Sequence, residues 1–240
     1  MSLKLLFTAI AGALLLSLFA PLSSNAGELA NAGPADPPLS SYFDKTEQYD
    51  FELPHPGSYA LPAVKNAPSG NVIDYRGFPT SLQQQMLDKI SLVSFVYLHC
   101  NEEKGCPLAI STLYELFDGS AAIPELRKDV QLLMISFDPA RDDFAAIEAF
   151  VYPLLADPEA SKKLPWHVYT TENQQQLKPI LNGFGQAINP EADNDVINHL
   201  LRMFLVDRTG RIRNIYGLGM IDPRLIITDI ETLLMEEAQN

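Results

Sequence analysis

The sequence predicts an α/β fold with a central, mostly parallel sheet, flanking helices and a C-terminal antiparallel hairpin. Residues 89–98 and 130–137 are near-continuous apolar runs, which are typical of strands covered on both faces. From the first of these runs to the C-terminus, strand patterns alternate with amphipathic helical patterns. Such alternation is typical of parallel strands joined by helices, so we expect one α/β domain.

Each element follows from a local pattern. After the first strand, Pro107 opens a helix, because proline is favoured in a first turn. The second strand is followed by a helix over residues 142–155 that turns an apolar face inward, with Phe144, Ile147, Phe150 and Val151. We then expect strands over 166–170, 200–206 and 212–216, the last two joined by a turn at 207–210, and helices over 173–184 and 222–234.

The N-terminal residues 1–26 are typical of a signal peptide. Lys4 is followed by an apolar or small run over residues 5–20, and residues 24–26 form a small-x-small cleavage pattern. The run is shorter than the ~20 residues of a membrane span. We therefore expect cleavage after Ala26 and export to the periplasm, with an uncleaved membrane anchor as the alternative. Residues 27–69 are then a Pro-rich extended arm or linker, and residues 70–240 the folded domain.

Charge restricts the choice of partners. The chain has 17 basic and 30 acidic residues, a formal net charge of −13. This balance argues against nucleic acid as a partner, because phosphate recognition needs clustered Lys and Arg. It is compatible with basic or metal partners.

The chain has two cysteines, Cys100 and Cys106, which flank a short loop between the first strand and the helix at Pro107. As thiolates they are soft ligands that suit copper, and as a dithiol/disulfide couple they can exchange electrons. In an oxidising compartment we expect them to form a Cys100–Cys106 disulfide. Since Cys106 is at a helix N-terminus, we expect its thiolate to be stabilised there. An inert disulfide that only restrains a loop is the alternative.

His199 is the candidate third partner of the thiols. It precedes the strand at 200–206, which can neighbour the strand that ends near Cys100. Two thiolates and an imidazole form a reasonable ligand set for Cu(I) or Cu(II). His99 is a possible fourth ligand or a charge beside Cys100, or a side chain that points away. His55 and His167 are interpreted as structural or solvated.

A polar cluster, Asp138, Arg141 and Asp142, follows the second buried strand. It could be a helix cap with a local ion pair, since either aspartate can accept first-turn N–H groups. Alternatively, it supports the cysteine loop or docks a partner. Motifs for a Ser-His-Asp triad, a phosphate-binding loop, a zinc site or haem attachment are not found.

Four segments in order resemble the Sco (SenC) family of copper-insertion proteins. They are residues 95–97 before Cys100, then Cys106-Pro107, then residues 135–142, and finally His199 before residues 204–207 and 210–212. The resemblance implies a thioredoxin-like fold with copper bound by Cys100, Cys106 and His199. It also implies a cuproprotein recipient, such as the cytochrome oxidase subunit that carries the CuA site. The cluster around Asp138 matches the family's acidic loop, which is implicated in partner or metal handling.

One departure from the family concerns the cysteine spacing. Five residues separate Cys100 from Cys106, where the family normally has three. We expect a copper metallochaperone rather than an enzyme. A thiol–disulfide oxidoreductase acting on a partner protein, or a redox sensor, would use the same cysteines without copper. A thiol peroxidase is a weaker option, since the sequence shows no clear set of supporting donors.

Overall fold

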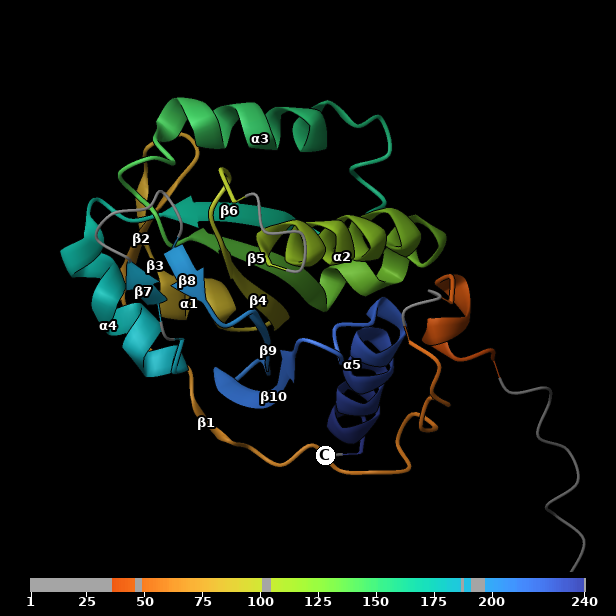
Figure 1. Cartoon of the computed structure of the whole chain (residues 1–240). Helices are drawn as coiled ribbons and strands as arrows, with labels where there is room; N and C mark the ends of the chain where they lie inside the picture. Colours follow the sequence, from red (N-terminus) through yellow and green to blue (C-terminus); the bar gives the residue numbers. More distant parts are fainter. Residues whose placement is uncertain (1–35, 46–48, 101–104, 187, 191–196, 240) are drawn as a thin grey trace, which may run out of the picture. The chain divides into compact units, whose positions relative to one another are not determined.

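The predicted first strand is β4 (Ile90–Val96), and every one of its residues is buried. A computed structural model describes residues 36–239 apart from 46–48, 101–104, 187 and 191–196, and for 188–190 and 197–199 it describes the backbone only. Residues 37–240 form one compact unit (Figure 1). The expected signal peptide at 1–26 lies outside the described residues.

β4 is at the centre of an eight-stranded sheet with the order β1-β10-β9-β4-β5-β6-β2-β3. The strands that follow the predicted pattern are β5 (Val130–Ser136), β6 (Trp166–Thr170), β9 (Arg202–Val206) and β10 (Arg211–Gly217). β9 and β10 form the expected antiparallel hairpin. From β4 to the C-terminus the predicted strands and helices occur in the predicted order, but two short strands that were not predicted, β7 (Ile188–Pro190) and β8 (Ile197–His199), lie between α4 and β9.

The prediction of a mostly parallel sheet was wrong in its extent. Only β4–β5 and β5–β6 are parallel, whereas the other five pairings in the sheet are antiparallel. Two of the antiparallel pairings belong to β9, which pairs with β4 and with β10, and the other three come from short strands that extend both edges of the sheet without a crossover helix. These strands are β1 (Lys65–Asn66), β2 (Asn71–Asp74) and β3 (Pro79–Ser81). They are short and partly exposed, so they carry no apolar run in the sequence.

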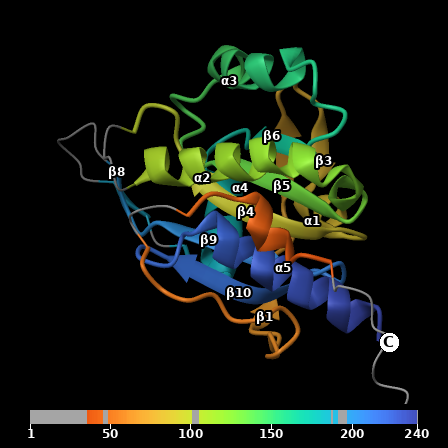
Figure 2. The ribbon, with the colours of Figure 1, turned by 90° about the vertical axis from the view of Figure 1, so that its right-hand side faces the viewer.

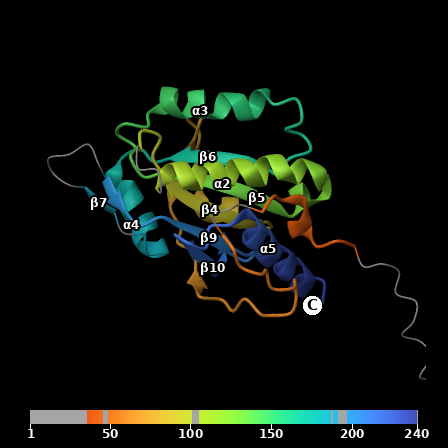
Figure 3. The ribbon, with the colours of Figure 1, turned by 45° about the vertical axis from the view of Figure 1, so that its right-hand side comes forward.

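Helices cover both faces of the sheet. α2 (Cys106–Gly119) and α5 (Pro223–Glu237) lie in front of the sheet in Figure 2, and α4 (Gln174–Phe184) lies behind it. α3 (Phe144–Ala156) runs along the top of the domain in Figure 3, above β6. A short helix, α1 (Leu82–Met86), follows β3, and 3-10 turns occur at Leu39–Tyr42, Ser120–Ala122 and Pro124–Lys128.

α3 differs from its prediction in two respects. It begins at Phe144 because Asp143 accepts a hydrogen bond from the backbone N–H of Ala146, so neither Asp138 nor Asp142 caps it. Phe144 does not face inward, since it is 49% exposed, while Ile147 and Val151 are buried as predicted.

The Pro-rich segment before Gly70 contacts the folded domain. Val64 and Ala67 donate backbone hydrogen bonds to Ile212 and Gly210, and β1 pairs with β10. Phe43 and Leu61 are buried within the hydrophobic core. The described part of this segment is therefore packed along the domain, although the domain boundary at residue 70 remains a prediction.

Candidate functional site

Cys100 and Cys106 lie beyond the C-terminal end of β4, at the edge where α2 begins. The backbone N–H of Cys100 bonds to the carbonyl of Tyr97, and Cys106 is the first residue of α2, with Pro107 in the first turn. Cys106 is fully buried, whereas Cys100 is half-buried. Both are thiols in the structure, and the Cys100–Cys106 disulfide remains a prediction.

The two thiols are close enough to influence each other. Burial raises the pKa of the Cys106 thiol above its usual range, and the neighbouring Cys100 thiol adds to the increase. The backbone N–H of Tyr97, 3.4 Å from the Cys106 sulfur, opposes this shift. The expectation that the helix N-terminus would stabilise the Cys106 thiolate was wrong in its net effect, because desolvation of the charged form is the larger influence.

An apolar pocket of about 360 Å³ surrounds the sulfurs. Its walls come from the segment that follows β4 and from the first three turns of α2. The lining consists of Tyr97, Leu98, Cys100, Cys106, Pro107, Ile110, Ser111 and Tyr114. Apart from the two thiols it contains few polar side chains. A metal ion or partner sulfur here would be shielded from water on one side.

His199 is the last residue of β8 (Ile197–His199), which pairs with β7 (Ile188–Pro190) and leads towards β9. Figures 1 and 2 show β8 on the side of the domain where α2 begins. The side chain of His199 lies outside the described residues. Within the described part of the chain no group of three His, Cys, Asp or Glu side chains could hold a metal ion. The role of His199 as third ligand therefore remains a prediction.

Asp142 ties the segment before Cys100 to the loop after β5. Its carboxylate is fully buried and accepts hydrogen bonds from the backbone N–H of Leu98, at 3.1 and 3.2 Å, and from the Ser136 hydroxyl at 2.6 Å. Nδ1 of His99 lies 3.2 Å from Asp142 Oδ1. Burial raises the pKa of Asp142, although these donors favour its charged form. Asp142 thus holds the backbone that leads into Cys100.

Asp138 and Arg141 form an ion pair beside Asp142. Nε of Arg141 lies 2.7 Å from Asp138 Oδ2, and the guanidinium carbon of Arg141 lies 5.8 Å from the centre of the Tyr97 ring. Tyr97 also lines the thiol pocket. The predicted support residues His99, Asp138, Arg141 and Asp142 are therefore brought together next to the cysteine segment.

Sequence reasoning missed Ser136 and Tyr97. The Ser136 hydroxyl donates to Asp142 and accepts the backbone N–H of Asp138, so it organises the acidic loop. Tyr97 contributes a backbone N–H to Cys106 and a ring to the pocket. A polar residue at the very end of an apolar strand was the available signal for Ser136. A backbone donor such as that of Tyr97 leaves no signal in the sequence.

A thiol pair at the start of a helix, next to the central strand of this sheet, defines a thioredoxin-like dithiol protein. Residues 72–235 match the sequence model of the SCO1/SenC family. Because this match covers more than half of the chain, the protein belongs to the SCO1/SenC family.

Solved structures share the fold at low sequence identity. A SCO1/SenC family lipoprotein from Bacillus anthracis has a TM-score of 0.58 and 18% identity, covering 71% of this chain and 95% of its own. Yeast Sco1 has a TM-score of 0.56 and 17% identity, with 72% and 96% coverage. ScoI of Arabidopsis thaliana with copper bound has a TM-score of 0.53 and 18% identity, with 71% and 98% coverage. No curated protein sequence matches the chain.

Proposed function

We propose that this protein is an exported copper metallochaperone that binds copper through Cys100, Cys106 and His199 and transfers it to a cuproprotein. The observation that carries the proposal is the pair of interacting thiols at the start of α2 in a SCO1/SenC chain. Related ScoI structures from Arabidopsis thaliana and Bradyrhizobium japonicum contain copper. A recipient such as the CuA site of cytochrome oxidase fits this family, since one relative is described as a cytochrome c oxidase assembly protein.

The burial of Cys106 suits a soft, weakly hydrated metal ion. Copper must displace the thiol proton, because the thiolate is the ligand. The pair of thiolates would more than balance the single positive charge of Cu(I), and the apolar walls of the pocket would keep hard, strongly hydrated cations out. The half-buried Cys100 is the ligand that a recipient protein can reach, so transfer would start by exchange at its sulfur.

An anaerobic Cu(I) titration of the reduced mature protein against a competing chelator tests the assignment. We expect one tightly bound copper in the wild type. Cys106→Ser should weaken binding by about 100-fold or more, which corresponds to about 2.8 kcal/mol. In a separate titration with Cu(II), His199→Ala should weaken binding severely. His55→Ala, a change at an exposed histidine, should bind Cu(II) as the wild type does. Unchanged Cu(II) binding by His199→Ala would refute its role as a ligand.

A second candidate function is thiol–disulfide exchange with a partner protein. Cys100 is the more accessible thiol and would attack the partner's disulfide, which releases one partner thiol. Cys106 would then attack the mixed disulfide, so that the partner is fully reduced and a Cys100–Cys106 disulfide forms. A related protein, BsSco, is described as having a disulfide switch. The same variants separate the two functions, since exchange needs both cysteines but not His199.

Export is part of the proposal. The signal-peptide pattern at residues 1–26 supports it, and the Bacillus anthracis relative is described as a lipoprotein. Among the described residues, no helix has the length and apolar character needed to cross a membrane. A periplasmic chain that begins at Gly27 by intact-mass measurement is the expected result, and an unprocessed chain in the membrane fraction would favour the anchor.

A further inference from the structure

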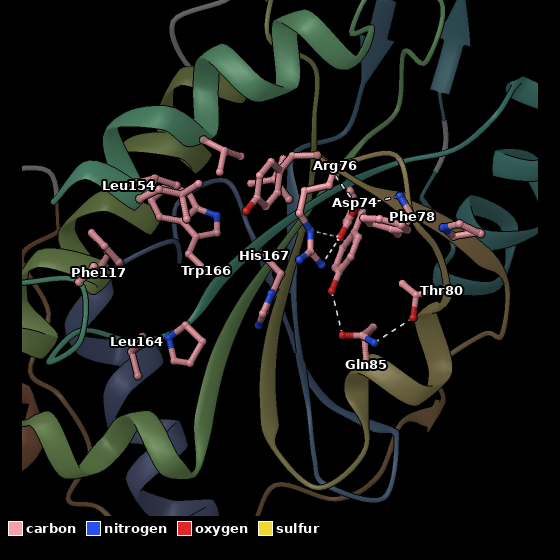
Figure 4. A pocket seen from close by; sticks show the side chains of 18 residues that line it. Asp74, Arg76, Phe78, Thr80, Gln85, Phe117, Leu154, Leu164, Trp166 and His167 are labelled. Atoms are coloured by element: carbon pink, nitrogen blue, oxygen red, sulfur yellow. Dashed lines mark hydrogen bonds and ion pairs between the residues drawn. The ribbon is translucent and has the colours of Figure 1, made fainter.

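A second cavity, of about 600 Å³, lies between α3, β6 and the β2–β3 hairpin (Figure 4). Its volume is within the range of small-molecule sites in proteins. The cavity exists because β2 pairs with β6 only at Tyr169 and Thr170. The preceding part of β6, residues 166–168, lines the cavity instead.

The cavity has an apolar end and a polar end. Figure 4 shows Phe117, Leu154, Leu164 and Trp166 together on one side, and Asp74, Arg76, Thr80 and Gln85 on the other, with His167 between them. At the polar end Tyr169 donates its hydroxyl hydrogen to Gln85 at 2.9 Å, and Gln85 donates to Thr80 at 2.9 Å. An occupant would therefore have an apolar body and a polar group.

The lining carries no net charge. Its one cation, Arg76, donates two hydrogen bonds to Asp74 Oδ2, at 2.9 and 2.7 Å. Burial raises the pKa of Asp74, but the backbone N–H of Phe78 and the Arg76 guanidinium outweigh this and lower it overall, so Asp74 is charged. Burial, together with the charge of Lys89, lowers the pKa of His167, which keeps its ring neutral. A charged occupant would lose its hydration without gaining a counter-charge.

One lining group lacks a partner. The indole Nε1–H of Trp166 is buried and makes no hydrogen bond to the described part of the chain. Its accessible area is below 1 Å², so neighbouring atoms cover it in this structure. Buried donors are rarely left unpaired, because their lost hydration is then not replaced. An occupant would therefore contact the indole through its ring carbons, and its polar group would lie at the polar end, beside Thr80 and Gln85 (Figure 4).

We propose that this cavity binds a neutral aromatic molecule that carries a hydroxyl or carbonyl oxygen. Its ring would pack among Trp166, Phe117 and Leu154, and its oxygen would lie toward the polar end of the cavity, beside Thr80 and Gln85. The site is separate from the thiol pocket. Trp166 packs edge-on against Tyr114, with ring centres 4.9 Å apart, and Tyr114 lines the thiol pocket on the other side.

The test uses 2-naphthol as the probe and the full mature chain. Trp166 is the only tryptophan, so its indole N–H gives a single, unambiguous signal in a ¹H–¹⁵N NMR spectrum. We expect 2-naphthol to shift this signal saturably. Its anionic analogue 2-naphthoate and plain naphthalene, which has no polar group, should each bind at least about 10-fold more weakly. A missing or non-saturable shift with 2-naphthol, or equal binding of 2-naphthoate, would overturn the proposal.

A matched pair of variants places the binding site. Ala160 lines the cavity, whereas Ala156 is an exposed residue at the end of α3 outside the cavity lining. Ala160→Phe should fill the space and weaken 2-naphthol binding by about 10-fold or more, and Ala156→Phe should leave it unchanged. Equal affinities in the two variants would show that the probe binds elsewhere. Copper binding does not enter these measurements, so their outcome is independent of the proposed chaperone function.

Discussion

At the scale of single residues, the buried carboxylate of Asp142 is the main support of the cysteine segment. It joins the end of β4 to the loop after β5 through Leu98, Ser136 and His99. Leu98 and His99, which follow β4, and Ser136, the last residue of β5, all bond to this carboxylate. The strands are thereby held together at the edge where Cys100 lies.

Replacing Asp142 with Asn should destabilise the fold by about 1–3 kcal/mol, because an amide has one acceptor oxygen where the carboxylate has two. Asp143→Asn is the matched control, since Asp143 is exposed and caps α3, a role in which Asn and Asp are equivalent. Urea unfolding measures both changes. Similar losses in the two variants would contradict the role given to Asp142.

At the scale of elements, α5 and β10 hold the N-terminal Pro-rich segment in place. Gly57 N–H donates to the Thr232 hydroxyl at 3.1 Å, and Leu39 N–H donates to Glu231 at 2.8 Å. The Tyr59 hydroxyl donates to the buried carboxylate of Asp229, which also accepts from Asn214 and Tyr216 at 2.7 Å each. These hydrogen bonds order a segment whose prolines exclude helix.

Tyr59→Phe should loosen this segment, because it removes one donor to a buried carboxylate, an interaction that contributes about 1.5–3 kcal/mol. Limited proteolysis should cut residues 49–66 faster in this variant than in the wild type. In Tyr152→Phe, the same change at a residue that is 70% exposed, the protease should cut this segment at the wild-type rate. If Tyr59→Phe were as resistant as the wild type, the hydrogen bond to Asp229 would not be what holds the segment.

At the scale of the whole molecule, the sheet brings together charges that are distant in sequence. Lys89 precedes β4, and His167 lies in β6, with β5 between them. Burial and the charge of Lys89 lower the pKa of His167 below its usual value of 6.5. Unfolding restores the ordinary pKa, so the unfolded chain binds a proton over the interval below about 6.5 in which the folded chain does not.

Stability should therefore fall as the pH drops from about 6.5 towards the lowered pKa of His167. His167→Gln should remove this part of the pH dependence, which urea unfolding at pH 7.5 and pH 5.5 can measure. His55→Gln, in the exposed part of the N-terminal segment, is the control and should follow the wild-type curve. A wild-type slope in His167→Gln would show that other groups dominate the acid response.

Much of the fold could be predicted because long buried strands and amphipathic helices have strong local patterns. β4 and β5 were found by their apolar runs, and Pro107 and Asp222 marked the starts of α2 and α5. The edge strands β1, β2 and β3 were missed, since strands of two to four partly exposed residues have no such pattern. Whether two strands pair in parallel or antiparallel depends on how the chain returns to the sheet. The spacing of apolar residues in the sequence carries no information about that path.

For the site, the sequence by itself determined which residues carry the chemistry. Two cysteines beside a strand end and a helix start are recognisable from residue type and position alone, as is the acidic cluster after β5. Only the tertiary structure decided how those residues behave. It buried Cys106 and raised its pKa, and it left the Trp166 N–H, beside a cavity, without a hydrogen bond to any of the described residues. The physical reason is that pKa values and unmet hydrogen bonds depend on desolvation by atoms from distant parts of the chain, which exist as neighbours only after folding.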